Sequence, residues 1–327
     1  MRAWTVDGVG APADVMRLVD IDEPRPGPGE VLLDVRAAGV GMPDAFMCRA
    51  TYAFSPPHPF VPGQEVCATV IGVGEGVDLG IGERVMGVTS FYDGRGGLAE
   101  RTVANATTLF RVPASMSDAS AATFRIGFST ALIGLQRRGR VVAGEHVLVL
   151  GGAGGSGVTA IQVAKALGAE VTAVVSSPEK AQLCRDMGAD AVIDRTTGDV
   201  VEAVLARTGG RGVDLVYDPV GGELADACVQ CIAPDGRLLL VGFASGRWAA
   251  PSMDPVVRRN VSLVGVYAGG LTRGDNEIDH EFLLSLFEEG RFHAYVGEIP
   301  FERAVDAVSA VDRGDVVGKS AVLMTKE

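Results

Sequence analysis

One glycine-rich loop constrains the fold of this chain more than any other feature of its sequence. The loop follows the apolar run His146–Leu150 and precedes the helical pattern Val158–Leu167. Glycines at these spacings permit a tight turn and let the backbone approach a pyrophosphate, and the following helix offers unpaired N–H groups. A glycine turn alone would be a weak signal, but its place between a strand and a helix predicts a dinucleotide-binding site. The residues assigned to this site are Gly152, Ala153, Gly154, Gly155, Ser156 and Gly157.

The region around this loop alternates short apolar runs with helical patterns. Runs such as Glu170–Val175 and Leu215–Tyr217 are nearly continuous in apolar residues, as are strands of a parallel sheet that helices cover on both faces. The further runs are Ala191–Ile193, Arg237–Val241 and Ser262–Val266. The sequence therefore predicts an α/β fold in which residues 121–267 form a Rossmann domain with a doubly wound parallel sheet.

The two flanking regions have a different texture. Residues 1–120 contain many short strand-like runs, such as Val31–Ala37, separated by Gly and Pro, which is typical of a β-rich or barrel-like domain. The Ala-rich segment Ser117–Leu135 predicts a helix with its first serine as the N-cap. Residues 268–327 end in the strand-like Ala321–Met324, which we expect to return to the first domain.

Length and composition exclude several classes of protein. A chain of 327 residues exceeds one comfortable hydrophobic core, so two domains are expected. The net charge of −12 disfavours nucleic acid or an anionic membrane as the main partner. The sequence contains no apolar run long enough to cross a bilayer and no apolar signal core near Asp7. The five cysteines are widely spread and are interpreted as reduced thiols. Together with the absence of a membrane or signal segment, they predict a cytoplasmic protein.

The choice between NADH and NADPH is normally made at the end of the second Rossmann strand, where an acidic residue binds the ribose of NAD. Here the strand ends in Ser176 and Ser177, and Lys180 follows one turn later. Two hydroxyls and an ammonium suit a phosphate dianion, so these residues predict NADPH. The serines are equally able to cap the next helix, and the two roles are compatible. Arg195, after the third strand, is either a second cation for the phosphate or an ordinary surface residue.

Motifs along the whole chain resemble the medium-chain dehydrogenase/reductase superfamily, and within it the zinc-free quinone oxidoreductase (zeta-crystallin-like) branch. Their order and spacing carry the resemblance. The motifs are Pro26–Glu30, Ala38–Val40 with Asp44, Pro62–Glu65, Gly96–Glu100, Thr130–Ala131, the glycine loop, Asp218–Gly222 and Gly318–Lys319. The resemblance implies a GroES-like catalytic domain built from both chain ends, with the Rossmann domain between them in the sequence. A cofactor cleft between the two domains is implied as well. It also implies homodimers that pair the last Rossmann strand, near Val261–Tyr267.

The resemblance also implies further cofactor contacts. Thr130 is expected at the phosphates or the nicotinamide ribose, and Lys319 at the adenosine end. The segments that contain Val241, Phe243 and Val266 are expected to line the nicotinamide. For all of these the alternative is plain packing at strand ends. In the first domain Met42 and Asp44 are assigned to the cofactor, and Asp44 has either a structural or a cofactor-orienting role.

Two positions argue against a catalytic zinc. Zinc-dependent members of the superfamily carry a cysteine where this chain has Gly41 and a histidine where it has Gln64. Glycine has no ligand atom, and a neutral amide is a poor zinc ligand compared with thiolate or imidazole. Residues 88–110 contain no cysteines for a second, structural zinc, and the pair Cys228 and Cys231 has no matching second pair. We therefore expect no metal site.

Without a Lewis acid, the easier reaction is hydride transfer to an electron-poor acceptor, either a quinone or an α,β-unsaturated carbonyl compound. Tyr52 is the candidate hydrogen-bond donor to the developing oxyanion, because related enoyl reductases carry a tyrosine in this region; an aromatic lid on the cofactor is equally consistent. Gly41 lacks the asparagine amide of many quinone-reductase relatives. Two other functions stay open, an enoyl-thioester reductase and a non-catalytic cofactor-binding protein.

Overall fold

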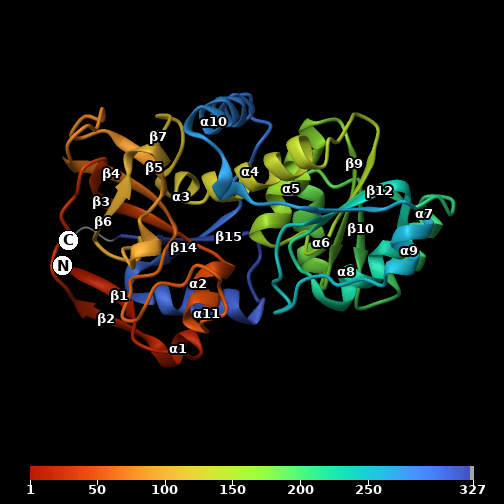
Figure 1. The fold of residues 1–327 in the computed structure, drawn as a ribbon, viewed down its shortest axis with the longest axis horizontal. Helices are drawn as coiled ribbons and strands as arrows, with labels where there is room; N and C mark the ends of the chain where they lie inside the picture. The colour runs from red at the N-terminus through yellow and green to blue at the C-terminus, as the bar shows by residue number, and fades with distance from the viewer. Residues whose placement is uncertain (325–327) are drawn as a thin grey trace. The chain divides into compact units, whose positions relative to one another are not determined.

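The computed structural model describes residues 1–324, which divide into two compact units (Figure 1). One unit contains Met1–Ile126 and the chain from Ala294 onward, and the other contains Gly127–His293. The sequence placed the divisions near residues 120 and 267. The second unit extends further along the chain, to His293, and within it Arg137 forms ion pairs with Asp275 and Asp279 of the helix that follows the last Rossmann strand.

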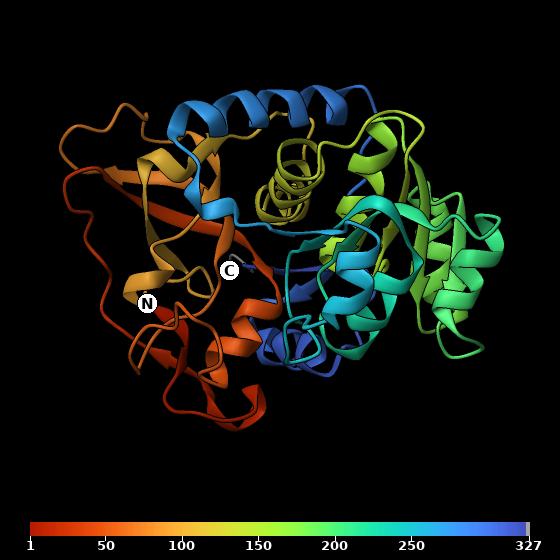
Figure 2. The same ribbon diagram turned by 45° about the vertical axis from the view of Figure 1, so that its right-hand side comes forward.

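The second unit is built on a six-stranded sheet in which every pair of neighbouring strands is parallel, with helices on both faces (Figure 2). The strand order is β10-β9-β8-β11-β12-β13. The strands are β8 (His146–Val149), β9 (Glu170–Val175), β10 (Ala191–Asp194), β11 (Val213–Asp218), β12 (Ile232–Leu240) and β13 (Ser262–Gly265). The helices are α5 (Gly155–Ala166), α6 (Pro178–Asp186), α7 (Val200–Arg207), α8 (Gly222–Cys228), α9 (Met253–Arg258) and α10 (Arg273–Glu288). The strand order reverses between β8 and β11, the point at which doubly wound sheets bind their ligands. The predicted Rossmann domain is confirmed.

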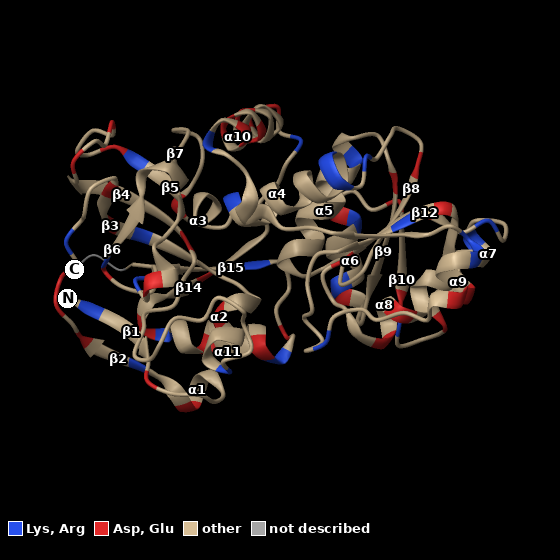
Figure 3. Cartoon of the chain, in the orientation of Figure 1, with Lys and Arg blue, Asp and Glu red and all other residues tan. Residues whose placement is uncertain are grey.

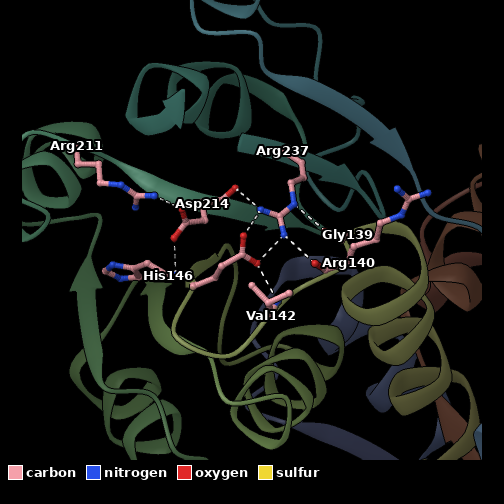
Figure 4. Close-up of polar contacts among 8 residues, drawn as sticks. Gly139, Arg140, Val142, His146, Arg211, Asp214 and Arg237 are labelled. Atoms are coloured by element: carbon pink, nitrogen blue, oxygen red, sulfur yellow. Dashed lines mark hydrogen bonds and ion pairs between the residues drawn. The ribbon is translucent and has the colours of Figure 1, made fainter. Parts of the chain in front are cut away.

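An ion-pair network connects residues near the amino ends of β8 and β11 with Arg237 of β12 (Figure 4). The guanidinium of Arg237 in β12 donates two hydrogen bonds of 2.7 Å to Glu145 and one of 2.7 Å to the carbonyl of Gly139. Asp214 accepts a hydrogen bond of 2.8 Å from the backbone N–H of His146, the first residue of β8. The glycine loop follows the other end of β8, so this network stabilises the sheet rather than the site.

The first unit contains a seven-stranded sheet with the path β14-β15-β3-β4-β5-β7, and β6 pairs with β3. Its strands are β3 (Glu30–Val40), β4 (Glu65–Val73), β5 (Arg84–Val88), β6 (Arg101–Asn105), β7 (Leu109–Arg111), β14 (Val296–Pro300) and β15 (Lys319–Leu323), beside the hairpin β1 (Arg2–Val6) and β2 (Met16–Asp20). Its helices are α1 (Pro12–Val15), α2 (Met42–Cys48), α3 (Asp118–Ala121) and α11 (Ala304–Arg313). β15 pairs antiparallel with β3, so the C-terminal part of the chain returns to the N-terminal sheet.

The helix expected over Ser117–Leu135 is interrupted. Ser117 caps α3, as predicted, but a break precedes α4 (Arg125–Leu132), which continues as a π-helix over Ile133–Arg138. At the start of α4 the backbone N–H of Ile126 donates to the carboxylate of Glu65 at 3.0 Å instead of to a carbonyl one turn earlier. A partner 61 positions away therefore satisfies this N–H group where the helix is interrupted.

Acidic and basic residues are interspersed along both units, so the net charge of −12 is not concentrated in one element (Figure 3). Among the described residues, none of the helices combines the length and the hydropathy that a bilayer-spanning segment needs.

Candidate functional site

The glycine loop is packed so closely that side chains would not fit at two of its positions. A Cβ atom on Gly157 would lie 2.3 Å from the carbonyl oxygen of Gly151. A Cβ on Gly152 would lie 2.8 Å from the Cβ of Ala173 in β9 and 3.0 Å from the sulfur of Cys184. These two positions of the turn therefore require glycine.

The helix that follows the loop has no side-chain cap. Its N-cap residue is Gly154, which lacks a side chain to accept hydrogen bonds from the first turn. By contrast, α6, α7 and α10 are capped by the side chains of Ser177, Asp199 and Thr272. Uncapped N–H groups at the start of α5, which has 12 residues, suit an anionic group such as a pyrophosphate. The loop thus fits the dinucleotide that the sequence predicts.

The four residues assigned to the 2′-phosphate come together at the carboxyl ends of β9 and β10. The backbone N–H of Arg195 donates to the carbonyl of Val175, the last residue of β9, at 3.0 Å. Ser176 and Ser177 follow directly, and the Ser177 hydroxyl accepts a 3.3 Å hydrogen bond from the N–H of Lys180. Ser177 is therefore a helix cap, the alternative role considered above, and its hydroxyl proton is still able to reach a ligand.

Sequence reasoning missed an acidic residue at the same edge. Asp194 is the last residue of β10, and its carboxylate accepts hydrogen bonds from the N–H and hydroxyl of Thr196 at 2.9 Å and 2.7 Å. These bonds hold the pKa of Asp194 below its usual value. The sequence analysis had looked for an acidic residue only at the end of the second strand. A pocket of about 210 Å³ lies next to this edge and is lined by Arg195, Gly198, Asp199, Val200, Val201, Leu224, Ala227 and Cys228.

The candidates for the nicotinamide end lie at the same edge of the sheet as the glycine loop. Val241 directly follows β12 and donates its N–H to the carbonyl of Asp218 at 2.9 Å. Val266 directly follows β13 and donates to the carbonyl of Leu240 at 3.0 Å. Phe243 packs against Trp248 with a ring distance of 4.8 Å. Thr130 is half-buried in α4. These positions are compatible with both readings, cofactor contact and strand-end packing.

One residue of the loop is supported by a side chain that the sequence had not singled out. The hydroxyl groups of Ser156 and Tyr217 lie 3.1 Å apart, and Tyr217 is fully buried in the central strand β11. Burial raises the pKa of the Tyr217 phenol, so it remains a neutral hydrogen-bonding group. This contact with the buried strand β11 helps to fix the orientation of the Ser156 side chain.

In the first unit, Asp44 connects two segments of the backbone. Its carboxylate accepts backbone hydrogen bonds from Gly63 at 2.8 Å and from Gly41 at 2.9 Å, and so joins two segments of the chain. Burial raises the pKa of Asp44 to about 6, while these N–H groups act to lower it. Both oxygens are used by the backbone, which favours the structural alternative for this residue. Met42, the first residue of α2, packs against the hydrophobic core.

Lys319 is held in a mostly buried ion pair. Its ammonium lies 3.5 Å from one carboxylate oxygen of Glu65, whose other oxygen accepts the N–H of Ile126. Burial raises the pKa of Glu65, and the charge of Lys319 opposes that rise. The expected contact of Lys319 with adenosine remains a prediction. The ion pair favours a function of Lys319 in neutralising the buried carboxylate of Glu65.

Tyr52 lies in the loop after α2 and belongs to an aromatic cluster. Its ring meets that of Phe54 edge-on at 5.7 Å, and Phe54 meets Tyr92 in the same way at 5.6 Å. Tyr52 is half-buried, while Phe54 and Tyr92 are exposed. This placement is compatible with a hydroxyl that reaches a substrate and with a packing lid.

Comparison with known proteins supports the fold and identifies the family of the chain. Residues 27–114 match the alcohol dehydrogenase GroES-like domain, and residues 155–285 match the zinc-binding dehydrogenase family. Quinone oxidoreductase-like protein 2 of Rattus norvegicus is 32% identical over 303 residues, covering 90% of this chain and 85% of the relative. The chain belongs to the zinc-independent quinone oxidoreductase branch of the medium-chain dehydrogenase/reductase superfamily.

Two solved structures of this superfamily superpose on nearly the whole chain. A mycobacterial protein complexed with NADPH is 32% identical, with a TM-score of 0.90 and 99% of each chain covered. The quinone oxidoreductase of Escherichia coli complexed with NADPH is 25% identical, with a TM-score of 0.90 and coverage of 99% of this chain and 100% of that one. The chain is therefore an oxidoreductase of a family whose members bind a nicotinamide cofactor.

The name of the second matching family mentions zinc, but the donor set here does not fit that metal. Among residues 1–324, no three histidine, cysteine or acidic side chains are grouped as metal ligands would be. Cys228 and Cys231 are buried, and the Cys231 thiol donates to the carbonyl of Cys228 at 3.1 Å. Both cysteines belong to a hydrophobic core cluster of the second unit.

Proposed function

We propose that this protein is an NADPH-dependent reductase that transfers hydride to a quinone or an α,β-unsaturated carbonyl compound. The observation that carries the proposal is the uncapped start of α5 behind the glycine loop, next to the cluster of Ser176, Ser177, Lys180 and Arg195. The two similar structures complexed with NADPH support it.

One set of residues binds the cofactor, and another stabilises the charge that forms on the acceptor. The backbone of the glycine loop binds the pyrophosphate, and Lys180 with Arg195 neutralises the 2′-phosphate. When bound, the nicotinamide supplies the hydride. Hydride addition pushes negative charge onto the acceptor oxygen, so the protein must supply hydrogen-bond donors there. Tyr52 is the donor proposed from the sequence.

An acceptor panel tests this proposal against its alternatives. We expect oxidation of NADPH, followed by its absorbance, with quinones or short enones. Preferential turnover of enoyl-CoA esters would instead identify an enoyl-thioester reductase. Tight NADPH binding without turnover of any acceptor would identify a non-catalytic cofactor-binding protein. Wild-type protein without affinity for either nicotinamide dinucleotide would contradict the assignment of the glycine loop.

The activity is expected to be independent of zinc. Gly41 and Gln64 offer no thiolate or imidazole at the positions of the zinc ligands in zinc-dependent relatives. Metal analysis of purified protein should find less than stoichiometric zinc, and treatment with a chelator should leave turnover unchanged. One tightly bound zinc per chain would contradict the prediction.

The protein is expected to form a homodimer through β13. This strand is at the edge of the six-stranded sheet, and the exposed side chains near it include Leu263 and Tyr267. Pairing two such edges would satisfy their free backbone groups and cover apolar surface. Sedimentation at micromolar concentration should give about twice the mass of one chain, and a monomer would contradict the prediction.

We place the activity in the cytoplasm. All five cysteines are buried free thiols, which suits a reducing compartment. Localisation of the tagged full chain by fractionation tests this assignment.

A further inference from the structure

We propose that the side-chain amide of Gln64 is a catalytic hydrogen-bond donor that binds the carbonyl oxygen of the acceptor. This inference rests on the proposed function and names the group that stabilises the oxyanion formed in that reaction. The inference rests on three features that occur together. The Gln64 amide is buried without a partner among the described residues, its turn is held by hydrogen bonds, and the nearby charges sum to zero.

The backbone around Gln64 is fixed from three sides. Gly63 donates its N–H to Asp44 at 2.8 Å, and the carbonyl of Gln64 accepts the N–H of Thr89 at 2.9 Å. On the other side, Glu65 is held by Ile126 and Lys319. A side chain on such a backbone starts from a defined position, which is what a preorganised donor requires.

The amide itself is not satisfied. Gln64 is 7% exposed, and its Nε2 atom is buried without a hydrogen-bond partner among the described residues. Gln162 provides a contrast, since it is 4% exposed and its Nε2 donates to the carbonyls of Val158 and His293 at 3.0 Å and 3.2 Å. An unpaired buried donor costs free energy, so such groups are rare unless a ligand satisfies them. The N–H groups of the Gln64 amide are therefore not used by the described residues.

The charges near Gln64 favour a neutral donor. The pKa of Glu65 is raised by burial and lowered by the charges of Lys319 and Arg125, while Lys319 also acts on Asp44. Two carboxylates and two cations give a formal charge of zero. A developing oxyanion therefore meets no net repulsion, and an amide N–H stabilises it without changing this balance.

The backbone next to Gln64 is also connected to Gly41 through Asp44. Gly41 has no side chain, yet the same carboxylate of Asp44 that holds Gly63 also holds the N–H of Gly41 at 2.9 Å. The turn that carries Gln64 is thus tied directly to the position where many relatives have an asparagine amide.

The reaction with an enone balances as follows. Hydride adds to the β-carbon with two electrons, the electron pair of the C=C bond moves toward the carbonyl, and the oxygen becomes an enolate oxyanion. The Gln64 amide donates a hydrogen bond to that oxygen without giving up a proton. A proton from water then completes the saturated ketone, so one NADPH and one proton are consumed for each acceptor reduced.

The test is the substitution Gln64→Met, which keeps an unbranched side chain and removes the amide. With the best acceptor of the panel, turnover should fall by roughly ten- to a thousandfold, as on removal of one oxyanion donor. The Kd for NADPH should not change. Because no satisfied hydrogen bond is lost, the Tm should stay at the wild-type value or rise.

The matched control is Gln162→Met, which removes a fully bonded buried amide from α5. It should lower the Tm while turnover by the folded enzyme stays near the wild-type value. A lowered Tm in Gln64→Met like that of the control, with turnover lost in proportion to unfolding, would show that Gln64 is structural and overturn the inference. Unchanged turnover in a stable Gln64→Met protein would overturn it as well.

A second variant, Gln64→Glu, keeps the shape but donates only when protonated. Its turnover relative to wild type should fall as the pH rises, because the introduced carboxyl group then loses its proton and can no longer donate; Asp44, Glu65, Lys319 and Arg125 are the charged groups nearby in both proteins. A ratio that does not depend on pH would count against the inference. Failure of the proposed function is distinguishable, since wild-type protein would then reduce no acceptor of the panel.

Discussion

Replacing Tyr52 with phenylalanine should lower turnover of a quinone or enone by roughly ten- to a thousandfold, because one preorganised donor to an oxyanion contributes a few kcal/mol. The substitution keeps the ring that meets Phe54 edge-on at 5.7 Å, so the packing of the loop after α2 should be retained. Initial rates at saturating NADPH measure the effect, and the Kd for NADPH should stay constant.

Tyr92→Phe is the matched control, because it removes a hydroxyl from the same aromatic cluster at a more exposed ring. Its turnover should remain near that of wild type. If Tyr52→Phe is as active as this control, the Tyr52 ring is a packing lid, the alternative that the sequence left open. Tyr52→Phe combined with Gln64→Met further asks whether both donors act on one oxygen, since groups that share a partner give non-additive losses.

Much of the Rossmann domain could be predicted because its signals are local. The loop at 152–157 is defined by glycines at fixed spacing between an apolar strand and a helix, and the structure shows that Gly152 and Gly157 leave no space for a Cβ. Ser117 was likewise expected as a helix cap from its position before an Ala-rich segment, and its hydroxyl accepts the N–H of Ser120 at 3.2 Å.

The features that sequence reasoning missed depend on residues far apart in the chain. Glu65 accepts the N–H of Ile126 where a helix that local propensity extends is interrupted. Tyr217 supports Ser156 across 61 positions, and the unpaired amide of Gln64 is visible only once its surroundings are known. Asp194 was missed for another reason, because the usual rule for cofactor choice considers one strand end only.

Asp194 makes the cofactor prediction sharper. A carboxylate whose pKa is lowered lies one residue before Arg195 and acts against a 2′-phosphate at this edge. A preference for NADPH therefore requires cations that outweigh it. Arg195 is exposed after β10, and Lys180 is half-buried in the first turn of α6, the helix that follows β9. Lys180 is thus expected to carry much of the preference.

Lys180→Ala should weaken NADPH binding by roughly ten- to a hundredfold, because a charge-assisted hydrogen bond contributes about 1.5–3 kcal/mol. NADH lacks the 2′-phosphate, so its Kd should hardly change. Fluorescence titration of both cofactors against wild type and variant measures the two effects. Lys165→Ala is the control, because Lys165 pairs with Asp190 at 2.8 Å and should not affect the ratio of the two affinities. Equal losses for NADPH and NADH would show that Lys180 only stabilises α6. Wild-type protein that prefers NADH would show that Asp194, rather than the serines and Lys180, determines the choice of cofactor.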